Sequence, residues 1–532
     1  MAFADLLEQV GSMGRFQYLH VTLLSLPILM LASHNLLQNF AAAVPPHHCA
    51  FRGNLSVPGL DTEETLRISV PLDQRGRPQQ CRRYAQPQWH LLGSNSSVEP
   101  EDKMEWDLVC DLRSLKRMGQ TVYMGGVLVG ALVFGGLSDR FGRRVLLLIS
   151  NLLLAVSGTC AAFSTSFTMF CVFRFFCGMG LSGLILNSFS LSEYHALQKP
   201  QITGYCYTIG QIILAMVAYY IRDWRWLILA VSLFPSGLWL LWVCRWFLES
   251  ARWLVLSKKP EQAVKNLKAV AYINGRHAER EKINLELHTC VHMSCSKGSY
   301  SGVDLLRTQT LRTITICLSA VWSVTAFSTS FAYYGLSMDL QKFGVNIYLI
   351  QVIFGAVDIP SKIIVTVCMS TIGRRLSQCG ALVLSGVAIF INLLVPYELQ
   401  LVRTTLAVIG KGCLAASFSC CYLYSGELYP TVIRQNGMGW VTMMGRLGAM
   451  VAPMVLMLVE VKVWLPGLIF GGVPILSGIF AYFLPETLAS PLPDTIQDAE
   501  DRGFKRRHFK QDSEKEELAL KEQSNSPLKE LA

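Results

Sequence analysis

Residues 136–144 read GLSDRFGRR, and a shorter version of this stretch, IGRR, occupies residues 372–375. Each stretch directly follows an apolar run long enough to cross a membrane. The glycines permit a tight turn, Asp139 can cap the start of a helix, and the arginines can bind carboxylates of neighbouring helices. The simpler alternative is an arginine anchor at the cytoplasmic surface alone. The repeat favours a chain built from two similar halves.

Apolar runs of about 20 residues, the length that crosses a hydrocarbon core, recur along the whole chain. Of its 532 residues, 52% are hydrophobic and only 16% are charged, whereas soluble proteins carry about 25% charged residues. We expect twelve membrane-spanning helices, at 16–40, 120–138, 145–164, 168–191, 203–221, 227–247, 312–335, 346–371, 377–395, 402–424, 436–459 and 464–484. The repeated loop follows the second span of each set of six. The sequence thus predicts an all-α polytopic membrane protein with two six-helix halves.

Basic residues predict the side of the membrane on which each loop lies. The repeated loops and the connector between the halves are rich in Lys and Arg, which concentrate in cytoplasmic loops. The formal charge of +10 is therefore explained without a nucleic-acid partner. We expect a cytoplasmic N-terminus (1–15), an N-terminal half (16–247) with an extracellular segment (41–119), a cytoplasmic linker (248–311), a C-terminal half (312–484) and a disordered cytoplasmic tail (485–532).

The extracellular segment carries two glycosylation sequons, at Asn54 and Asn95. It also holds three cysteines: Cys49, Cys81 and Cys110. Cysteines beside sequons indicate an oxidising compartment, and an odd count leaves one thiol without an intramolecular partner. The segment therefore agrees with an extracellular position and a plasma-membrane protein.

Charged residues inside apolar spans are costly, so they usually face a cavity or a partner. Asp358 and Lys362 are four residues apart on one helix face, so they either neutralise each other or bind a ligand. Arg446 is fourteen residues from the nearest acid of its own span, Glu460. Unless another helix supplies a carboxylate or backbone carbonyls hold it, Arg446 is a cationic site suited to anions.

Several motifs resemble the organic anion transporters of the solute carrier 22 family, which belongs to the major facilitator superfamily. In chain order they are MAF at 1–3, GRFQ at 14–17, PHHC at 46–49, EWDLVC at 105–110, ESARW at 249–253, FAYYG at 331–335, GKGC at 410–413, ELYPT at 427–431 and LPET at 484–487. The 136–144 loop is similar to the loop signature of the superfamily. The resemblance covers residues 1 to about 500. It implies an antiporter that moves small organic anions across the lipid bilayer, with 2-oxoglutarate or a similar dicarboxylate, and chloride, as counter-ions.

The resemblance also implies site residues. The arginine matching Arg446 helps bind the anion, whereas cation-carrying relatives have an acid there. Cavity positions are implied for Tyr207, Tyr333, Tyr334, Phe418, Tyr422, Asn35 and Asn39, although aromatics in a span can also simply pack or face lipid. Conformational gating is expected of the repeated loops, at Asp139, Arg140, Gly142, Arg143, Arg374 and Arg375. One departure is a missing Cys-x-Asp-Gly-Trp stretch before Glu105, which raises a non-functional variant as an alternative.

Other function classes lack support in the sequence. The cluster of His288, Cys290, His292 and Cys295 matches no common zinc pattern, and Gly410-Lys411 lacks the upstream glycine of a phosphate-binding loop. We therefore expect no metal, no cofactor and no catalytic residue. A membrane receptor would not need the repeated loop, and a membrane enzyme would need an intramembrane nucleophile or metal cluster. An organic cation or zwitterion carrier of the same fold is the nearest rival.

The sequons generate the first testable prediction. Glycosidase treatment of the cell-expressed protein should increase its gel mobility, because Asn54 and Asn95 lie in a segment expected outside the cell. A variant carrying both Asn54→Gln and Asn95→Gln should already run at the shifted position and should not respond to the enzyme. Unchanged mobility of the parent protein would contradict the predicted topology.

Overall fold

The computed structural model describes residues 14–43, 113–191, 199–257, 259–276, 309–338, 340, 345–396, 398–428, 434–484 and 486–488. The first half contains α2 (Arg15–Leu36), α3 (Gln38–Ala41), α5 (Arg113–Phe141), α6 (Arg143–Ala162), α7 (Phe167–Leu191), α8 (Lys199–Tyr220) and α9 (Trp224–Trp246). The second half contains α13 (Gln309–Ser337), α14 (Ile347–Thr371), α15 (Arg374–Leu394), α16 (Gln400–Leu428), α17 (Arg434–Met457), the 3-10 turn η6 (Leu458–Glu460) and α18 (Leu465–Ala481). Between the halves lie α10 (Ala251–Leu256) and α11 (Pro260–Ile273).

Each of the twelve predicted spans coincides with a described helix, and α2 and α3 share the first span with a break at Leu37. Eight of the helices are long and apolar enough to cross a membrane by length and composition. The ranges that the structure describes contain no strand. The twelve-helix fold class is therefore confirmed. The sequons, the cysteines of 41–119, the cluster at 288–295 and the tail beyond 488 lie outside the described residues.

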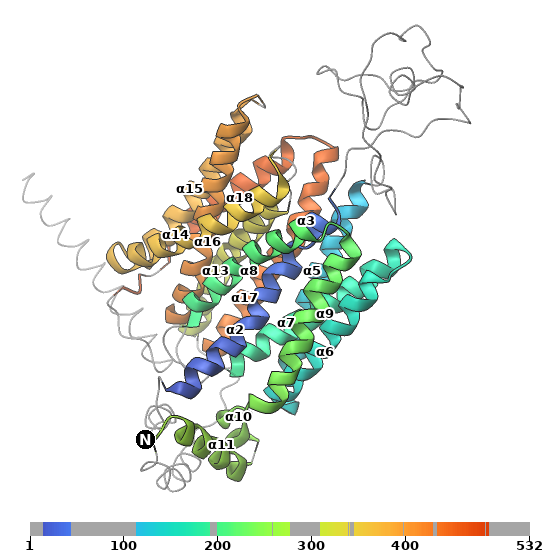
Figure 1. Cartoon of the computed structure of the whole chain (residues 1–532). Coiled ribbons are helices and arrows are strands. Elements are labelled where there is room, and N and C mark those ends of the chain that lie inside the picture. Colours follow the sequence, from blue (N-terminus) through green and yellow to red (C-terminus); the bar gives the residue numbers. More distant parts are fainter. Residues whose placement is uncertain are drawn as a thin grey trace, which may run out of the picture.

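The helices of the two halves pack in the same pattern (Figure 1). In the first half, α2 packs on α8, α5 on α7, and α6 on both α7 and α9. In the second half, α13 packs on α17, α14 on α16, and α15 on both α16 and α18. Counted within each half, these are the same four pairs: first with fifth, second with fourth, third with fourth and third with sixth. The internal repeat predicted from the two loops therefore extends to the packing of the whole half.

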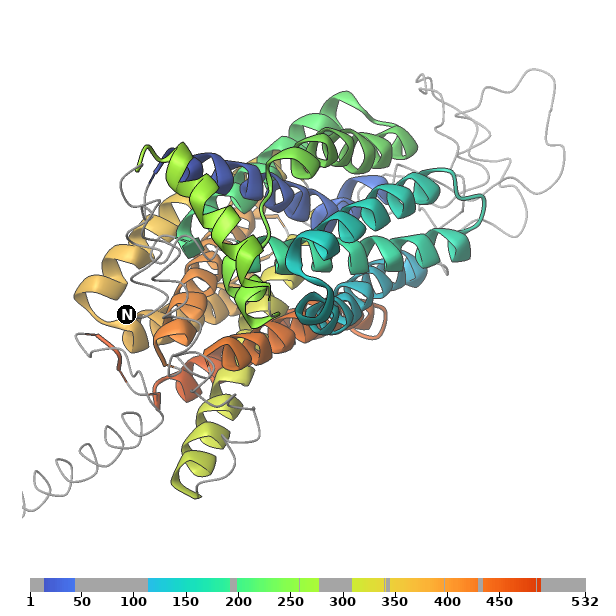
Figure 2. The same cartoon turned by 90° about the horizontal axis from the view of Figure 1, so that it is seen from below.

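Contacts between the halves are reciprocal as well. The second helix of each half packs on the fifth helix of the other, α5 on α17 and α14 on α8. The view from below in Figure 2 shows the two groups of helices side by side, and Figure 1 shows α10 and α11 at one end of the bundle. This reciprocity is what a pseudo-twofold axis between the halves requires.

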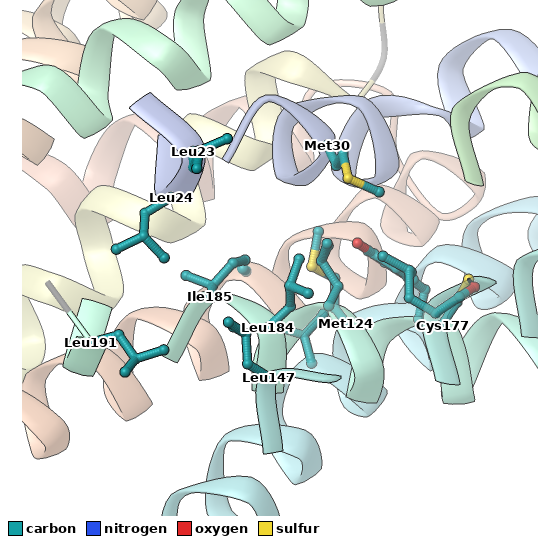
Figure 3. Packing of buried hydrophobic residues seen from close by; sticks show 14 of the residues in the cluster. Leu23, Leu24, Met30, Met124, Leu147, Cys177, Leu184, Ile185 and Leu191 are labelled. Atoms are coloured by element: carbon teal, nitrogen blue, oxygen red, sulfur yellow. Dashed lines mark hydrogen bonds between the residues drawn. The ribbon is translucent and has the colours of Figure 1, made fainter. Parts of the chain in front are cut away.

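Close helix contact in the first half depends on small residues. A Cβ on Gly126 of α5 would lie 2.1 Å from the carbonyl oxygen of Phe175, and one on Gly178 of α7 would lie 2.3 Å from that of Tyr123. Glycines of this kind let membrane helices approach closely, because association there depends on van der Waals packing rather than on exclusion of water. Beside this contact, buried side chains of α2, α5, α6 and α7 form one apolar cluster (Figure 3).

The first repeated loop ends α5 and begins α6. Gly142 has a φ of 95°, a conformation that favours glycine. The next two backbone amides, of Arg143 and Arg144, donate to the two oxygens of Glu249 at 3.0 and 3.1 Å. A carboxylate at this position satisfies free amides at the start of the helix and complements its dipole. The acid that binds the first amides of α6 is thus Glu249, a hundred residues later in the chain. The side chain of Asp139, which the sequence suggested as a cap, lies outside the described residues.

The second repeated loop has the same construction. Gly373 has a φ of 106°, and the backbone amides of Arg374 and Arg375 donate to the carboxylate of Glu486 at 2.9 and 3.0 Å. The Arg374 guanidinium also forms a two-pronged ion pair with Glu427, both contacts at 3.0 Å. The expectation that these arginines bind carboxylates of neighbouring helices thus holds for Arg374.

Glu486 provides a pH-dependent prediction. Partial burial acts to raise the pKa of its carboxyl, but bonds from four backbone amides outweigh this and lower the pKa. The stabilisation is therefore complete above the ordinary glutamate pKa of about 4.3 and disappears as pH falls through the lowered value. Glu486→Gln should destabilise the detergent-solubilised protein at pH 7 by about 1–3 kcal/mol.

Thermal melting of the parent and Glu486→Gln proteins at pH 7 and pH 4 measures this effect. The difference between them should narrow at the lower pH. Glu249→Gln, which disturbs the equivalent carboxylate of the first half, is the matched comparison for the loss of stability at pH 7. Equal melting temperatures for parent and Glu486→Gln at pH 7 would show that the cap contributes nothing.

Candidate functional site

Charged side chains buried within the described helices are few and mostly positive. They are Arg174, Asp358, Lys362 and Lys411. Arg446 is half-buried in α17. These described helices therefore hold four cations and one acid in a region where an uncompensated charge is costly. This imbalance is the main electrostatic feature of the bundle.

Asp358 of α14, the one acid buried within the described helices, accepts bonds from three residues. Its carboxylate forms an ion pair with Lys411 of α16 at 3.1 and 3.3 Å, and neither side chain is exposed. The Tyr333 hydroxyl and the Gln211 amide also donate to it, at 3.0 and 3.1 Å. The spacing within α14 suggested a pair with Lys362, and the structure corrects this, because a lysine from another helix holds the acid instead.

Lys362 lies one turn beyond Asp358 and is bound by neutral groups. Its ammonium donates to the backbone carbonyl of Gly204 and, at 2.6 Å, to the hydroxyl of Thr208, both in α8. These bonds join α14 of the second half to α8 of the first. Among the described residues, no carboxylate forms an ion pair with Lys362 at this interface.

Arg446 also reaches across the interface. Its Nη1 donates to the backbone carbonyl of Val127 in α5 at 2.9 Å and to the hydroxyl of Ser182 in α7. Among the described residues, no carboxylate forms an ion pair with it. The sequence left open whether backbone carbonyls hold Arg446 or whether it is a cation without an acid. In the structure, Arg446 binds a backbone carbonyl and also has no described acid as a partner. Its charge, like that of Lys362, is not compensated by its described partners.

The five aromatic residues singled out in the sequence form one connected cluster. Tyr333 of α13 lies at its centre, with ring centroids 6.4 Å from Tyr207, 5.5 Å from Tyr334 and 5.5 Å from Phe418. Phe418 in turn lies 5.6 Å from Tyr422. The rings come from α8, α13 and α16, so both halves contribute. Because Tyr333 also donates to Asp358, the aromatic cluster and the charged group are continuous.

The two asparagines of the first span both bind residues of α13. Asn35 accepts a bond from Tyr123 of α5 at 2.8 Å and donates to the hydroxyl of Tyr334 at 3.0 Å. Asn39 donates to the carbonyl of Ser337 at 2.7 Å. Both asparagines therefore connect α2 and α3 to α13 across the interface. The Asn35 amide is bonded directly to a hydroxyl of the aromatic cluster.

Sequence reasoning missed two buried cations. Lys411 was considered only within the GKGC motif and as part of a possible phosphate-binding loop, although it is a lone lysine within an apolar span. Arg174 of α7 has the same signature, and its guanidinium stacks on the Tyr123 ring at 4.1 Å and donates to the carbonyl of His34. The signal that could have identified both residues in the sequence is a charged residue within an apolar span.

Sequence comparison shows what the chain is similar to. The sequence model of a family described as sugar (and other) transporters matches residues 93–497. "Solute carrier family 22 member 6" of Danio rerio is 66% identical, with 100% of both chains covered. "Organic anion transporter 3" of Homo sapiens is 46% identical, covering 98% of this chain and 97% of its own. The Danio rerio alignment spans 565 positions, more than the 532 residues of this chain, so the alignment places gaps in this chain.

Structural comparison places the fold. The inward open conformation of the xylose transporter XylE from E. coli has a TM-score of 0.62, with 90% of this chain and 98% of that chain covered. XylE bound to 6-bromo-6-deoxy-D-glucose has a TM-score of 0.58, covering 91% and 98%. Identity is 16% in both cases, so these similarities concern the fold alone.

The partners of Asp358 generate a stability prediction. Asp358→Asn should destabilise the detergent-solubilised protein by about 3–5 kcal/mol, because it leaves the Lys411 charge buried and unpaired. Lys362→Gln should destabilise the protein clearly less, because the glutamine amide can still donate to the Gly204 carbonyl and the Thr208 hydroxyl. Thermal melting of both variants measures the difference. If Lys362→Gln proves as damaging as Asp358→Asn, Lys411 is not the partner that matters for stability.

Proposed function

The chain belongs to solute carrier family 22, and on that premise we propose that it is an antiporter of small amphiphilic organic anions. It exchanges them across the plasma membrane for an intracellular dicarboxylate such as 2-oxoglutarate, with chloride as a further counter-ion. Its relatives and its fold are those of membrane transporters. The similarity to these transporters covers nearly the full chain, which supports transport rather than catalysis as its activity.

The observation that carries the anion assignment is the unbalanced positive charge at the interface between the halves. Lys362 and Arg446 both bind neutral groups there, and Lys411 neutralises the one buried acid. A carboxylate would replace those neutral acceptors with a counter-charge, so that both groups of each bond would be ionised. Two such cations also suit a dicarboxylate counter-substrate.

The aromatic cluster supports a flat, amphiphilic substrate. Rings on Tyr207, Tyr333, Tyr334, Phe418 and Tyr422 supply apolar contact area. The tyrosine hydroxyls and the amides of Asn35 and Asn39 supply polar contacts. Ligand sites commonly combine aromatic walls with a few polar groups. An aromatic carboxylate fits both the rings and the adjacent cations.

Transport proceeds by alternating access, in which the two halves rock about the site between them. Hydrogen bonds between the halves include those of Asn39 with the carbonyl of Ser337 and of Arg117 with the carbonyl of Leu456, at the end away from α10 and α11. Lys362 adds bonds to Gly204 and Thr208 in the first half of α8. With α10, α11 and both termini cytoplasmic, the end that carries the Asn39 and Arg117 bonds is extracellular. The repeated loops, through Asp139, Arg140, Gly142, Arg143, Arg374 and Arg375, are the gating elements on the cytoplasmic side.

An organic cation or zwitterion carrier is the second candidate, and one observation favours it. Asp358 is a buried acid next to aromatic rings, the combination that an organic cation would need. The acid already pairs with Lys411, however, so the net charge near the rings remains positive. A non-functional variant is the remaining alternative, and an absence of any uptake would support it.

Uptake measurements test both the function and the residue on which it depends. Cells expressing the chain should accumulate labelled hippurate, an aromatic carboxylate, faster after preloading with 2-oxoglutarate, and should not accumulate labelled tetraethylammonium. Arg446→Ala should weaken hippurate transport by roughly ten- to a hundredfold, because a charge-assisted bond is worth about 1.5–3 kcal/mol. Arg446→Lys should keep part of the activity, and Arg446→Asp should abolish it.

Surface biotinylation normalises each variant, because Arg446 also bonds across the interface and its loss can impair folding. Tetraethylammonium uptake without hippurate uptake would favour the cation carrier. If preloading with 2-oxoglutarate did not increase hippurate uptake, exchange for that dicarboxylate would be refuted. A well-expressed Arg446→Ala protein with unchanged hippurate affinity would refute the role of the arginine.

A further inference from the structure

The charge preference of the site depends on whether its one acid is available. Asp358 is the sole acid among the charged side chains buried in the described helices. One carboxylate oxygen accepts from Lys411, and the other accepts from Tyr333, Gln211 and Lys411. An organic cation would have to displace these donors to reach the acid. In the structure, Asp358 is therefore closed to a positively charged ligand.

Lys411 itself is enclosed and is not positioned as a ligand contact. Its side chain has no exposed surface, and its ammonium lies 3.6 Å from the centre of the Tyr333 ring and 5.9 Å from that of Phe354. The hydrogen bonds that it makes both go to Asp358. Any effect of Lys411 on substrate charge must then act through the acid that it holds.

Lys362 is the group that would respond if Lys411 were lost. It lies four residues after Asp358, and residues at this spacing face each other along a helix. At present its ammonium donates to a backbone carbonyl and to Thr208 instead. An Asp358 without Lys411 would be a strong alternative acceptor within one turn. Pairing with it would remove the Lys362 charge from the interface.

We propose that Lys411 determines the charge selectivity of the site by neutralising Asp358, which leaves Lys362 and Arg446 as cations available to anionic substrates. This rests on the proposed function. Lys411 is a positioning residue in this arrangement, since it acts through Asp358 without touching substrate. The site would prefer anions because a third helix, α16, supplies the counter-charge to α14.

The test compares Lys411→Met with the double variant Lys411→Met/Asp358→Asn. Methionine fills the space between the Tyr333 and Phe354 rings without charge, and asparagine keeps an acceptor for the Tyr333 hydroxyl. In transfected cells, Lys411→Met should raise the KM for labelled hippurate about tenfold or more and should admit labelled tetraethylammonium. The double variant should return the KM to within about threefold of the parent and exclude the cation again.

Surface-normalised kinetics separate this effect from a folding defect, which lowers the maximal rate without changing the KM. If the double variant retains the high KM, Lys411 contacts the substrate directly and the proposal is wrong. An unchanged KM in Lys411→Met would likewise overturn it. The parent protein is the control for the proposed function, because its failure to carry hippurate would refute that function whatever the variants did.

Discussion

The organisation of the site follows from the cost of placing charge inside a membrane bundle. An acid such as Asp358 is tolerated there only with a counter-charge and hydrogen-bond donors around it, and Lys411, Tyr333 and Gln211 provide them. Once the acid is satisfied, Lys362 has no carboxylate to bind and donates to the first half instead. One buried ion pair thus sets the charge of the interface and the contacts that connect the halves.

The two halves share a framework but differ in chemistry. Both use the same helix pairs, and both begin their third helix with a left-handed glycine and a carboxylate that binds two backbone amides. Their buried charges are unrelated, with an arginine stacked on Tyr123 in the first half and the Asp358–Lys411 pair in the second. A symmetric framework allows the halves to rock, whereas asymmetric side chains make the site between them selective.

Contacts across the interface are of a kind that can exchange during transport. Asn35, Lys362 and Arg446 each bind neutral hydroxyls or carbonyls of the opposite half. A bond between neutral groups contributes about 0.5–1.5 kcal/mol net, and a bond to a charged group contributes about 1.5–3 kcal/mol. Releasing Lys362 or Arg446 therefore requires another acceptor, such as the carboxylate of a substrate, to take the place of its present partner. The strong ion pairs that the structure describes, Asp358–Lys411 and Arg374–Glu427, lie within the second half. They therefore move with that half as a rigid body.

The sequence by itself determined the helices, their number and the division into two halves. In a membrane, backbone groups must bond within their own helix, so apolar runs of sufficient length specify the spans directly. It also pointed to the aromatic cluster and to Arg446. Only the tertiary structure decided which lysine holds Asp358 and which glutamates cap the loops, because Lys411, Glu249 and Glu486 are remote in sequence from the groups that they bind. Spacing along one helix reports neighbours on that helix, but a buried charge takes its partner from whichever helix packs against it.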